Sequence, residues 1–100
     1  MTSFELGFRP RARKDWDKLD DRTRKRLKKK LAERLALPRV QADKLRQMRD
    51  CYKIKLASVG YRLVYQVQDE ILLVLVIAVG RREDEEVYEK AWAELAQMDD

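Results

Sequence analysis

The sequence predicts an α+β fold whose elements follow the order β, α, α, β, β, β, α. Three observations predict it: alternating apolar residues at 4–8, two amphipathic helical repeats within residues 10–38, and three strand-like runs within residues 51–79. Apolar side chains at every second position indicate a strand, and those at every third or fourth position indicate a helix. A chain of 100 residues is long enough for one core, so we expect a single domain, residues 1–100.

The N-terminal part is predicted to contain one strand and a helical hairpin. The segment FELGF at residues 4–8 is apolar at every second position, as a strand requires. Pro10 suits the first turn of a helix because its missing N–H is not needed there. The apolar stripe that follows consists of Ala12, Trp16 and Leu19. In the second helix, which Pro38 ends, the apolar stripe consists of Leu27, Leu31 and Leu35.

The C-terminal half is predicted to contain three strands and a final helix. Residues 39–49 receive no element, and strands are expected at about 51–57, 61–68 and 71–79. The last run, ILLVLVIAV, is about half the length that a membrane helix needs, and its β-branched residues suit a central strand buried on both faces. Acids at residues 83–86 favour a helix start. The amphipathic helix then continues through Tyr88, Ala91, Trp92 and Leu95.

The chain is basic, with 23 Lys and Arg against 18 Asp and Glu and a net charge of +5. Basic residues concentrate at positions 9–34, whereas acids gather at 83–86 and at the C-terminus. This asymmetry fits a polyanionic partner such as nucleic acid, although the total charge fits an ordinary basic surface equally well. Cys51 is the single cysteine and no secretory pattern opens the chain, so we expect a reducing, cytoplasmic location.

The candidate site begins with Lys53 and Lys55, which share one face of the predicted strand because residues two apart point the same way. If a two-residue turn follows, Lys55 lies opposite Arg62. A shift of one residue would turn Arg62 toward the apolar face, so burial selects this register. Like charges that face each other destabilise a sheet. The three cations therefore form either an anion site suited to a phosphate or a solvated face where Lys discourages aggregation.

Two further residues are candidates because they follow the last strand. If the final helix folds back along the sheet, Arg82 and Tyr88 border the three cations. Tyr can stack on a base, and Arg can contact a phosphate or donate a proton. Taken singly, Arg82 fits a solvated loop cation better, and Tyr88 fits helix packing better.

Several kinds of catalytic site are excluded by the residues that the sequence lacks. The chain has no histidine, which is the usual general base of a ribonuclease. It contains no CxxC, HExxH, P-loop or GxGxxG pattern, and we interpret the acids at 83–86 as helix-start charges rather than metal ligands. We expect Cys51 to be a small core residue. Any catalysis must therefore depend on Lys, Arg and Tyr, without a cofactor or a metal.

The segments KLRQMRDCYKIKLASVGYRLVYQV and VIAVGRREDEEVY resemble the RelE family of bacterial toxins, the ribosome-dependent mRNA interferases of toxin-antitoxin systems. The resemblance extends from Phe4 to about Leu95. It implies a small antiparallel β-sheet with an N-terminal helical hairpin on one face and a C-terminal helix, a RelE-like or microbial RNase-like fold.

The resemblance also implies a mechanism. The toxin would cleave mRNA in the ribosomal A site by attack of a ribose 2′-hydroxyl on the adjacent phosphate, without a metal. Lys53 and Arg62 would hold the phosphate, Lys55 would act as general base, Arg82 as general acid, and Tyr88 would stack on a nucleotide. A lysine with a pKa of about 10.4 is a poor base near neutral pH unless neighbouring cations lower that pKa.

The implied partners are a RelB-like antitoxin that inhibits the toxin, and the small ribosomal subunit with mRNA in its A site. Ribosomal RNA would contact the basic residues Arg13, Lys14, Arg24, Lys28 and Arg81. A solvated helix face explains the helical members of this set equally well. The alternative function is a non-catalytic toxin of the same fold that binds the ribosome or poisons DNA gyrase.

Overall fold

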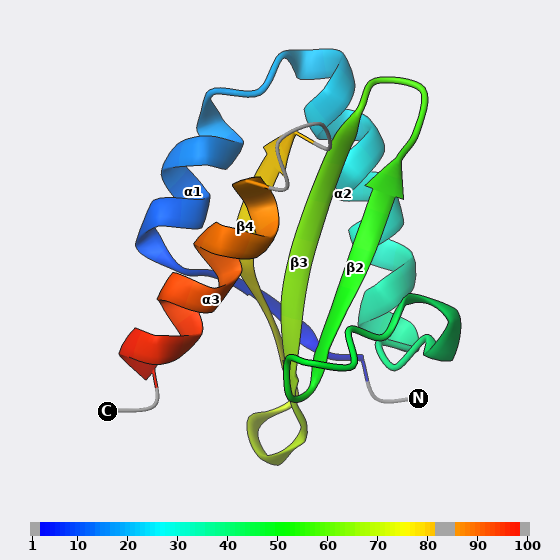
Figure 1. Ribbon diagram of the computed structural model, residues 1–100. Coiled ribbons are helices and arrows are strands. Elements are labelled where there is room, and N and C mark those ends of the chain that lie inside the picture. The colour runs from blue at the N-terminus through cyan, green and yellow to red at the C-terminus, as the bar shows by residue number, and fades with distance from the viewer. Residues whose placement is uncertain (1–2, 82–85, 99–100) are drawn as a thin grey trace.

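The computed structural model describes residues 3–81 and 86–98 and has the predicted α+β class and order βααβββα (Figure 1). Its elements are β1 (Glu5–Phe8), α1 (Pro10–Asp17), α2 (Asp21–Ala36), β2 (Cys51–Leu56), β3 (Tyr61–Gln68), β4 (Leu73–Arg81) and α3 (Glu86–Met98), with the 3-10 turns η1 (Gln41–Asp43) and η2 (Asp69–Ile71). Within the described ranges, none of the helices is long and apolar enough to cross a membrane.

The four strands form one sheet in the order β1-β4-β3-β2. Strands β2, β3 and β4 are antiparallel, as expected, but β1 runs parallel to β4, with Glu5 opposite Leu73. The sheet is therefore mixed. The chain leaves β1 through α1 and α2 to reach the far edge at β2, and two hairpins then return β4 beside β1 in the same direction. Strand β4 lies inside the sheet, as its apolar sequence predicts.

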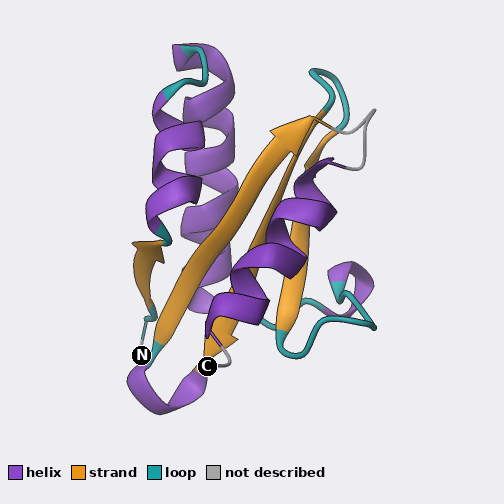
Figure 2. Cartoon of the chain, turned by 60° about the vertical axis from the view of Figure 1, so that its left-hand side comes forward, coloured by secondary structure: helices purple, strands orange, loops and turns teal. Residues whose placement is uncertain are grey.

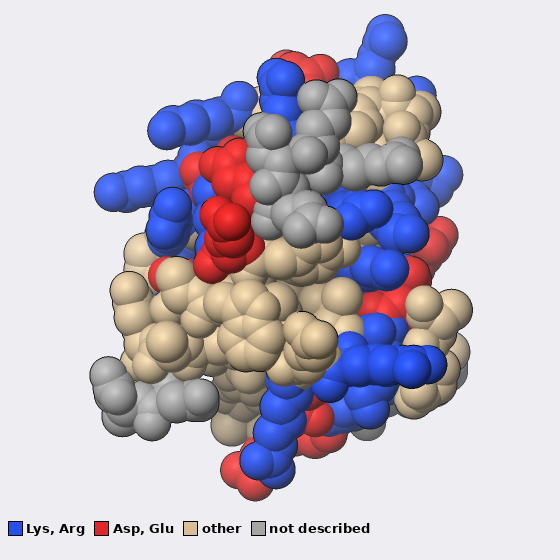
Figure 3. Space-filling model, in the orientation of Figure 1, with Lys and Arg blue, Asp and Glu red and all other residues tan. Residues whose placement is uncertain are grey.

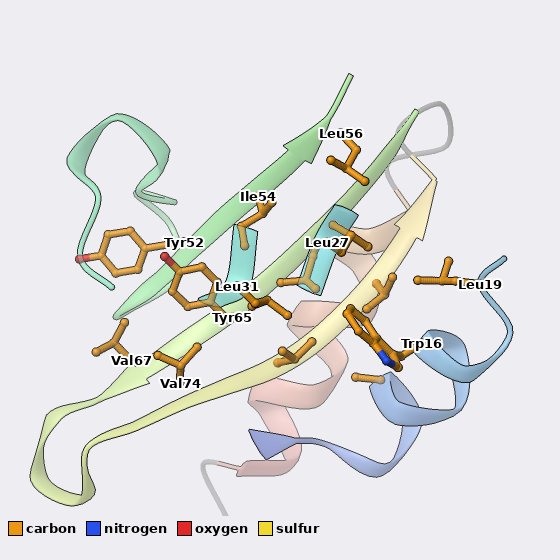
Figure 4. Close-up of a cluster of buried hydrophobic side chains, with 14 residues drawn as sticks. Trp16, Leu19, Leu27, Leu31, Tyr52, Ile54, Leu56, Tyr65, Val67 and Val74 are labelled. Carbon is orange, nitrogen blue, oxygen red and sulfur yellow. The ribbon is translucent and has the colours of Figure 1, made fainter. Parts of the chain in front are cut away.

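The α1–α2 hairpin covers one face of the sheet, and α3 covers part of the other (Figure 2). Leu27 and Leu31 on α2 are fully buried, and Trp16 on α1 is nearly so. They pack against strand side chains of the same core, shown in Figure 4, which include Tyr52, Ile54, Leu56, Tyr65, Val67 and Val74. This core holds β2 and β3 as a rigid support for whatever their opposite face carries.

Helix α3 packs on the other face through a second core. Val87 and Ala91 of α3 are fully buried in it together with Val64 of β3. At the side of this core, the Arg9 Nε lies 2.9 Å from Oε1 of Glu94, whose side chain is only 4% exposed. Helix α3 contacts β4 and β3 and leaves β2 beside it uncovered (Figure 1).

A β-bulge in β4 sets which residues face α3. Val64 pairs with Ala78 but Tyr65 pairs with Val76, so Ile77 is an extra residue in β4. Ile77 and Ala78 both belong to the core under α3. Because the bulge shifts the alternation by one residue, Gly80 lies against Val87 of α3.

The connection at residues 39–49 is held to the rest of the molecule at several points. Met48 is buried in the core under α3, and Leu45 packs against that core. Arg34 of α2 pairs with Asp43 at 2.6 Å. This connection runs along the start of β2 and borders the face on which the candidate site lies.

Candidate active site

The β2–β3 hairpin places Lys53, Lys55 and Arg62 on the sheet face that carries α3, and we call these three residues the cation cluster. Lys55 pairs with Arg62 in the register that the sequence predicts. Val64, which faces Lys53 across the strands, belongs to the core under α3, whereas Ile54 belongs to the core under α1 and α2. Figure 3 shows Lys and Arg side chains gathered beside α3, over β2 and β3.

Tyr88 of α3 joins the cation cluster through Arg62. The Nη1 of Arg62 donates a hydrogen bond of 3.0 Å to the Tyr88 Oη. The guanidinium carbon lies 5.6 Å from the centroid of the Tyr88 ring, within the range of a cation–π contact. The predicted proximity of Tyr88 to the cations is therefore present, and the ring forms the border between the cluster and α3.

Gly80 allows α3 to approach the sheet at this point, a role that sequence reasoning missed. Gly80 pairs with Arg62 in the sheet. A Cβ built on Gly80 would lie 3.3 Å from both the Cβ and the backbone nitrogen of Val87. Because Val87 precedes Tyr88, the missing side chain of Gly80 positions the Tyr88 ring. The available signal was a glycine within an apolar strand, which often marks a close backbone approach.

No acid in the described part of the chain compensates the positive charge of the cation cluster. Across residues 3–81 and 86–98, no acidic side chain forms an ion pair with any of its members. The positive charge of Lys53 and a side-chain contact with Lys53 lower the pKa of Lys55 below its ordinary value, and the charge of Arg62 adds to this effect. Asp43 opposes the shift only in part. Lys55 therefore loses its proton more readily than an isolated lysine.

No acid among the described residues pairs with Arg62, whose guanidinium contacts the Tyr88 ring. The Nε of Arg62 is buried and has no hydrogen-bond partner within the described parts of the chain. A buried donor without a partner costs about 1–3 kcal/mol. Among the described residues, the Nε of Arg62 is thus left unpaired while the guanidinium lies beside Tyr88.

Of the two adjacent arginines Arg81 and Arg82, only Arg81 is among the described residues. Arg82 lies outside the described residues. Arg81 is the last residue of β4 and is exposed, with its guanidinium carbon 5.8 Å from the centroid of the Tyr61 ring. Arg81 therefore stands at the end of the sheet.

The predicted RNA-binding residues of the helices lie on the other side of the sheet from the cation cluster. Arg13, Arg24 and Lys28 line one open groove of about 450 Å³ together with α1 and α2 neighbours. Within it, Arg13 pairs with Asp17 at 3.2 Å and Arg24 pairs with Asp21, so two of the three cations are partly neutralised. Lys14 is exposed on α1 and does not line this groove.

The described residues offer no alternative centre of metal or thiol chemistry. No group of three His, Cys, Asp or Glu side chains in these ranges could hold a metal ion. Cys51 is fully buried, and burial together with the charge of Asp50 raises the pKa of its thiol to about 12. A thiol with so high a pKa is a poor nucleophile near neutral pH.

Comparison with known proteins identifies relatives that share both sequence and fold. Residues 6–86 match the family model described as the ParE toxin of the type II toxin-antitoxin system parDE. The chain is 58% identical over 89 residues to the protein named mRNA interferase toxin RelE of Escherichia coli strain K12, an alignment that covers 89% of this chain and 94% of the relative.

Solved structures agree with this likeness. A free mutant of the E. coli toxin RelE superposes with a TM-score of 0.86 at 56% identity, covering 95% of this chain and 99% of that one. The same mutant in complex with a peptide of the antitoxin RelB gives a TM-score of 0.77 at 58% identity, covering 91% and 95%. The family model covers β2 and β3, the strands that carry the cation cluster. The chain therefore belongs to the RelE/ParE family of toxins from type II toxin-antitoxin systems.

Proposed function

We propose that this chain is a type II toxin that acts as an mRNA interferase, a ribosome-dependent endoribonuclease that inhibits translation by cleaving mRNA in the ribosomal A site. The observation that carries the proposal is the pairing of Lys55 with Arg62 beside Lys53, on a surface where no described acid neutralises them. A phosphodiester spreads its negative charge over several oxygens and fits such a surface. The relatives named mRNA interferase RelE support the same activity.

In the proposed reaction, the ribose 2′-oxygen attacks the adjacent phosphorus and the bond from phosphorus to the 5′-oxygen breaks. The products are a 2′,3′-cyclic phosphate and a 5′-hydroxyl. Lys55 in its neutral form accepts the 2′-hydroxyl proton, which the lowered pKa favours. Lys53 and Arg62 neutralise the charge that builds on the phosphate oxygens. Arg82 is assigned to the leaving 5′-oxygen by the resemblance, as proton donor or as a stabilising charge.

Tyr88 orients the substrate in this proposal. Its ring is fixed by Arg62 and faces solvent in part, so a nucleotide base can stack on it. The ordinary pKa values of lysine, arginine and tyrosine all lie well above neutral pH. A site built from these residues therefore lacks an efficient general base of its own. The ribosome therefore contributes by holding the mRNA in the reactive geometry.

The proposed contacts with ribosomal RNA and with mRNA lie on different surfaces of the protein. We propose that Arg13, Lys14, Arg24, Lys28 and Arg81 contact ribosomal RNA phosphates. The members on α1 and α2 lie over the sheet face opposite the cation cluster. Ribosomal RNA that binds there therefore leaves the cation cluster accessible to mRNA. Binding that depends on such contacts weakens steeply as salt concentration rises. A RelB-like antitoxin is proposed as the inhibitory partner, because RelE relatives form complexes with RelB. The cytoplasm is proposed as the location, because the proposed reaction takes place on ribosomes.

The test combines cleavage with binding. Purified protein is incubated with ribosomes carrying a defined mRNA, and primer extension maps the new 5′ ends. We expect cuts within the A-site codon for wild type, and no cuts for Lys55→Ala although this variant still co-sediments with ribosomes. Absence of A-site cuts by correctly folded wild type contradicts the proposal.

The second candidate is a non-catalytic toxin of the same fold. The family model that matches this chain is described as the ParE toxin, and this description is the observation that supports the second candidate. A toxin that acts only by binding does not need a general base. Growth arrest that persists in cells expressing Lys55→Ala, with ribosomal mRNA left intact, therefore supports the binding function over the nuclease.

A further inference from the structure

An open groove of about 490 Å³ adjoins the cation cluster, and of its lining residues the proposed function uses Tyr88 alone. One wall comes from the connection before β2 and the other from α3, and the lining consists of Leu45, Arg46, Gln47, Met48, Tyr88, Glu89 and Trp92. In Figure 3, an uncharged surface over α3 meets the Lys and Arg side chains over β2 and β3. The volume falls within the range of small-ligand sites.

Packing in the core does not account for the presence of Trp92 in this groove. Its side chain is 46% exposed, so it contributes little to the core beneath α3. It follows Tyr88 by four residues and therefore lies on the same side of the helix, one turn further along. Two aromatic rings one turn apart, beside a cluster of cations, resemble the stacking surfaces with which proteins hold single-stranded nucleic acid.

The groove is continuous with the cation cluster through Tyr88. The Tyr88 ring lines the groove, and its hydroxyl accepts the 3.0 Å hydrogen bond from Arg62. In single-stranded RNA each phosphate is followed by a sugar and a base. A phosphate held by Arg62 therefore places a neighbouring base near the wall that Tyr88 forms.

We propose that this groove is a nucleobase subsite for the nucleotide beside the scissile phosphate, with Trp92 as its stacking surface; this inference rests on the proposed nuclease function. Leu45 and Met48 supply apolar surface beneath the base. Gln47 is exposed at the rim and can donate to and accept from a base edge. Arg46, also exposed, is placed to meet the phosphate that follows. The groove thus contributes to substrate affinity and to base preference at one position of the cleaved codon.

The test is a double-mutant cycle between protein and RNA on programmed ribosomes. Wild type, Trp92→Ala and Trp92→Phe are assayed on mRNA with an intact codon and on mRNA with an abasic nucleotide on either side of the cut. We expect Trp92→Ala to lower kcat/KM about tenfold on intact mRNA, because stacking on one aromatic ring commonly contributes that much. Trp92→Phe should recover most of the loss. When the nucleotide that stacks on Trp92 is made abasic, wild type and Trp92→Ala should have the same kcat/KM. We expect this equality for the abasic nucleotide on one side of the cut only.

A matched control is Ile71→Ala, which removes an exposed apolar side chain at the far hairpin, where Ile71 is 65% exposed. It should cleave like wild type. Equal cleavage by Trp92→Ala and wild type overturns the subsite while leaving the nuclease proposal intact. Equal cleavage accompanied by weaker binding of the antitoxin by Trp92→Ala overturns it too, and assigns the groove to that partner. Failure of wild type to cut any programmed mRNA contradicts the nuclease proposal, and the subsite with it.

Discussion

Lys55 on β2 stands directly opposite Arg62 on β3, and both side chains lie on the sheet face that carries α3. Like charges in this position oppose pairing of the strands. The register persists because a shift of one residue would expose Ile54 and Leu63, which are both fully buried on the opposite face. Hydrophobic burial on one face thus fixes a repulsive arrangement on the other. The free protein therefore already holds Lys55 and Arg62 side by side on this face.

Replacing Lys55 by Arg separates the two roles of this residue. Arg keeps the positive charge but does not lose its proton near neutral pH, so it cannot serve as a general base. We expect Lys55→Arg to retain ribosome binding and to lower the single-turnover cleavage rate by roughly 10²- to 10⁴-fold, the usual contribution of general acid–base catalysis. A variant that cuts at the wild-type rate would show that Lys55 acts only through its charge.

The charge of Lys53 should set the pH dependence of cleavage. Lys53 is the main cause of the lowered pKa of Lys55, so Lys53→Gln should raise that pKa toward its ordinary value. Below the pKa, the neutral fraction of Lys55 rises with pH. The pH profile of kcat/KM, which reports the free enzyme, should therefore move to higher pH in Lys53→Gln and stay unchanged in Lys53→Arg. An unchanged midpoint in Lys53→Gln argues against coupling between the two lysines.

The repulsion between Lys55 and Arg62 predicts that removing one of these two charges stabilises the folded protein. Lys55→Gln removes one of two facing cations, so its melting temperature should exceed that of wild type. The lowered pKa of Lys55 means that the folded state disfavours its charged form. The difference in melting temperature should thus be present at neutral pH. It should begin to fall as pH rises through the pKa of Lys55 in the folded state, and it should be lost above the pKa of Lys55 in the unfolded state. Added salt should reduce it by screening. A melting temperature below that of wild type contradicts this prediction.

The hairpin that carries the cation cluster could be predicted from the sequence because its features are local. Alternation of apolar and charged residues gives the faces of β2 and β3, and a short turn then allows one register that buries the apolar set. The structure confirms the pairing of Lys55 with Arg62. The same alternation says nothing about direction between distant strands, which explains why the parallel pairing of β1 with β4 was missed.

Other features escaped prediction for different physical reasons. The run at 71–79 is apolar on both faces, so its pattern hides both its starting point and the bulge at Ile77. Strand β4 begins two residues late because Ile71 lies in a 3-10 turn and Leu72 adopts a left-handed conformation with a φ of 50°. The position of Gly80 under Val87 depends on that bulge. The glycine itself was a sequence signal for a close backbone approach, but Val87 could be identified as the neighbour only from the folded chain.

Gly80→Ala should impair cleavage by displacing the start of α3. The added methyl would lie 3.3 Å from the Cβ and the backbone nitrogen of Val87, neither of which can move without the helix. Overpacking of this kind costs about 1–3 kcal/mol of stability, and it moves Tyr88 away from Arg62. We therefore expect a cleavage rate well below that of wild type under conditions where the variant is fully folded, as judged by circular dichroism.

The control for this variant is Gly7→Ala. Its methyl would meet the end of the Leu73 side chain at 3.1 Å, and such a flexible end can rotate away. Gly7 lies on β1, at the opposite edge of the sheet from β2. Gly7→Ala should therefore cleave like wild type once folded. Equal cleavage by folded Gly80→Ala and wild type would show that the position of α3 does not matter to the reaction.

Tyr88 makes two contacts with Arg62, and two substitutions distinguish them. Tyr88→Phe removes the hydroxyl that accepts the 3.0 Å hydrogen bond from Arg62 but keeps the ring under its guanidinium. Tyr88→Ala removes both contacts and the surface on which a base can stack. Tyr88→Phe loses only this hydrogen bond, whereas Tyr88→Ala loses the bond, the cation–π contact and a stacking surface that contributes roughly 1–3 kcal/mol by itself. The ring should therefore matter more than the hydroxyl.

Cleavage kinetics on programmed ribosomes check this ranking. We expect Tyr88→Phe to retain most of kcat/KM and Tyr88→Ala to lose at least tenfold. In both variants Arg62 keeps its place in the β2–β3 register, so loss of the phosphate contact does not explain the difference. If Tyr88→Phe is as impaired as Tyr88→Ala, the hydroxyl itself takes part, either by fixing Arg62 or by contacting the reacting phosphate. A pH profile of Tyr88→Phe that matches wild type would then favour the first of these roles, because a hydroxyl that only orients Arg62 exchanges no proton with the substrate.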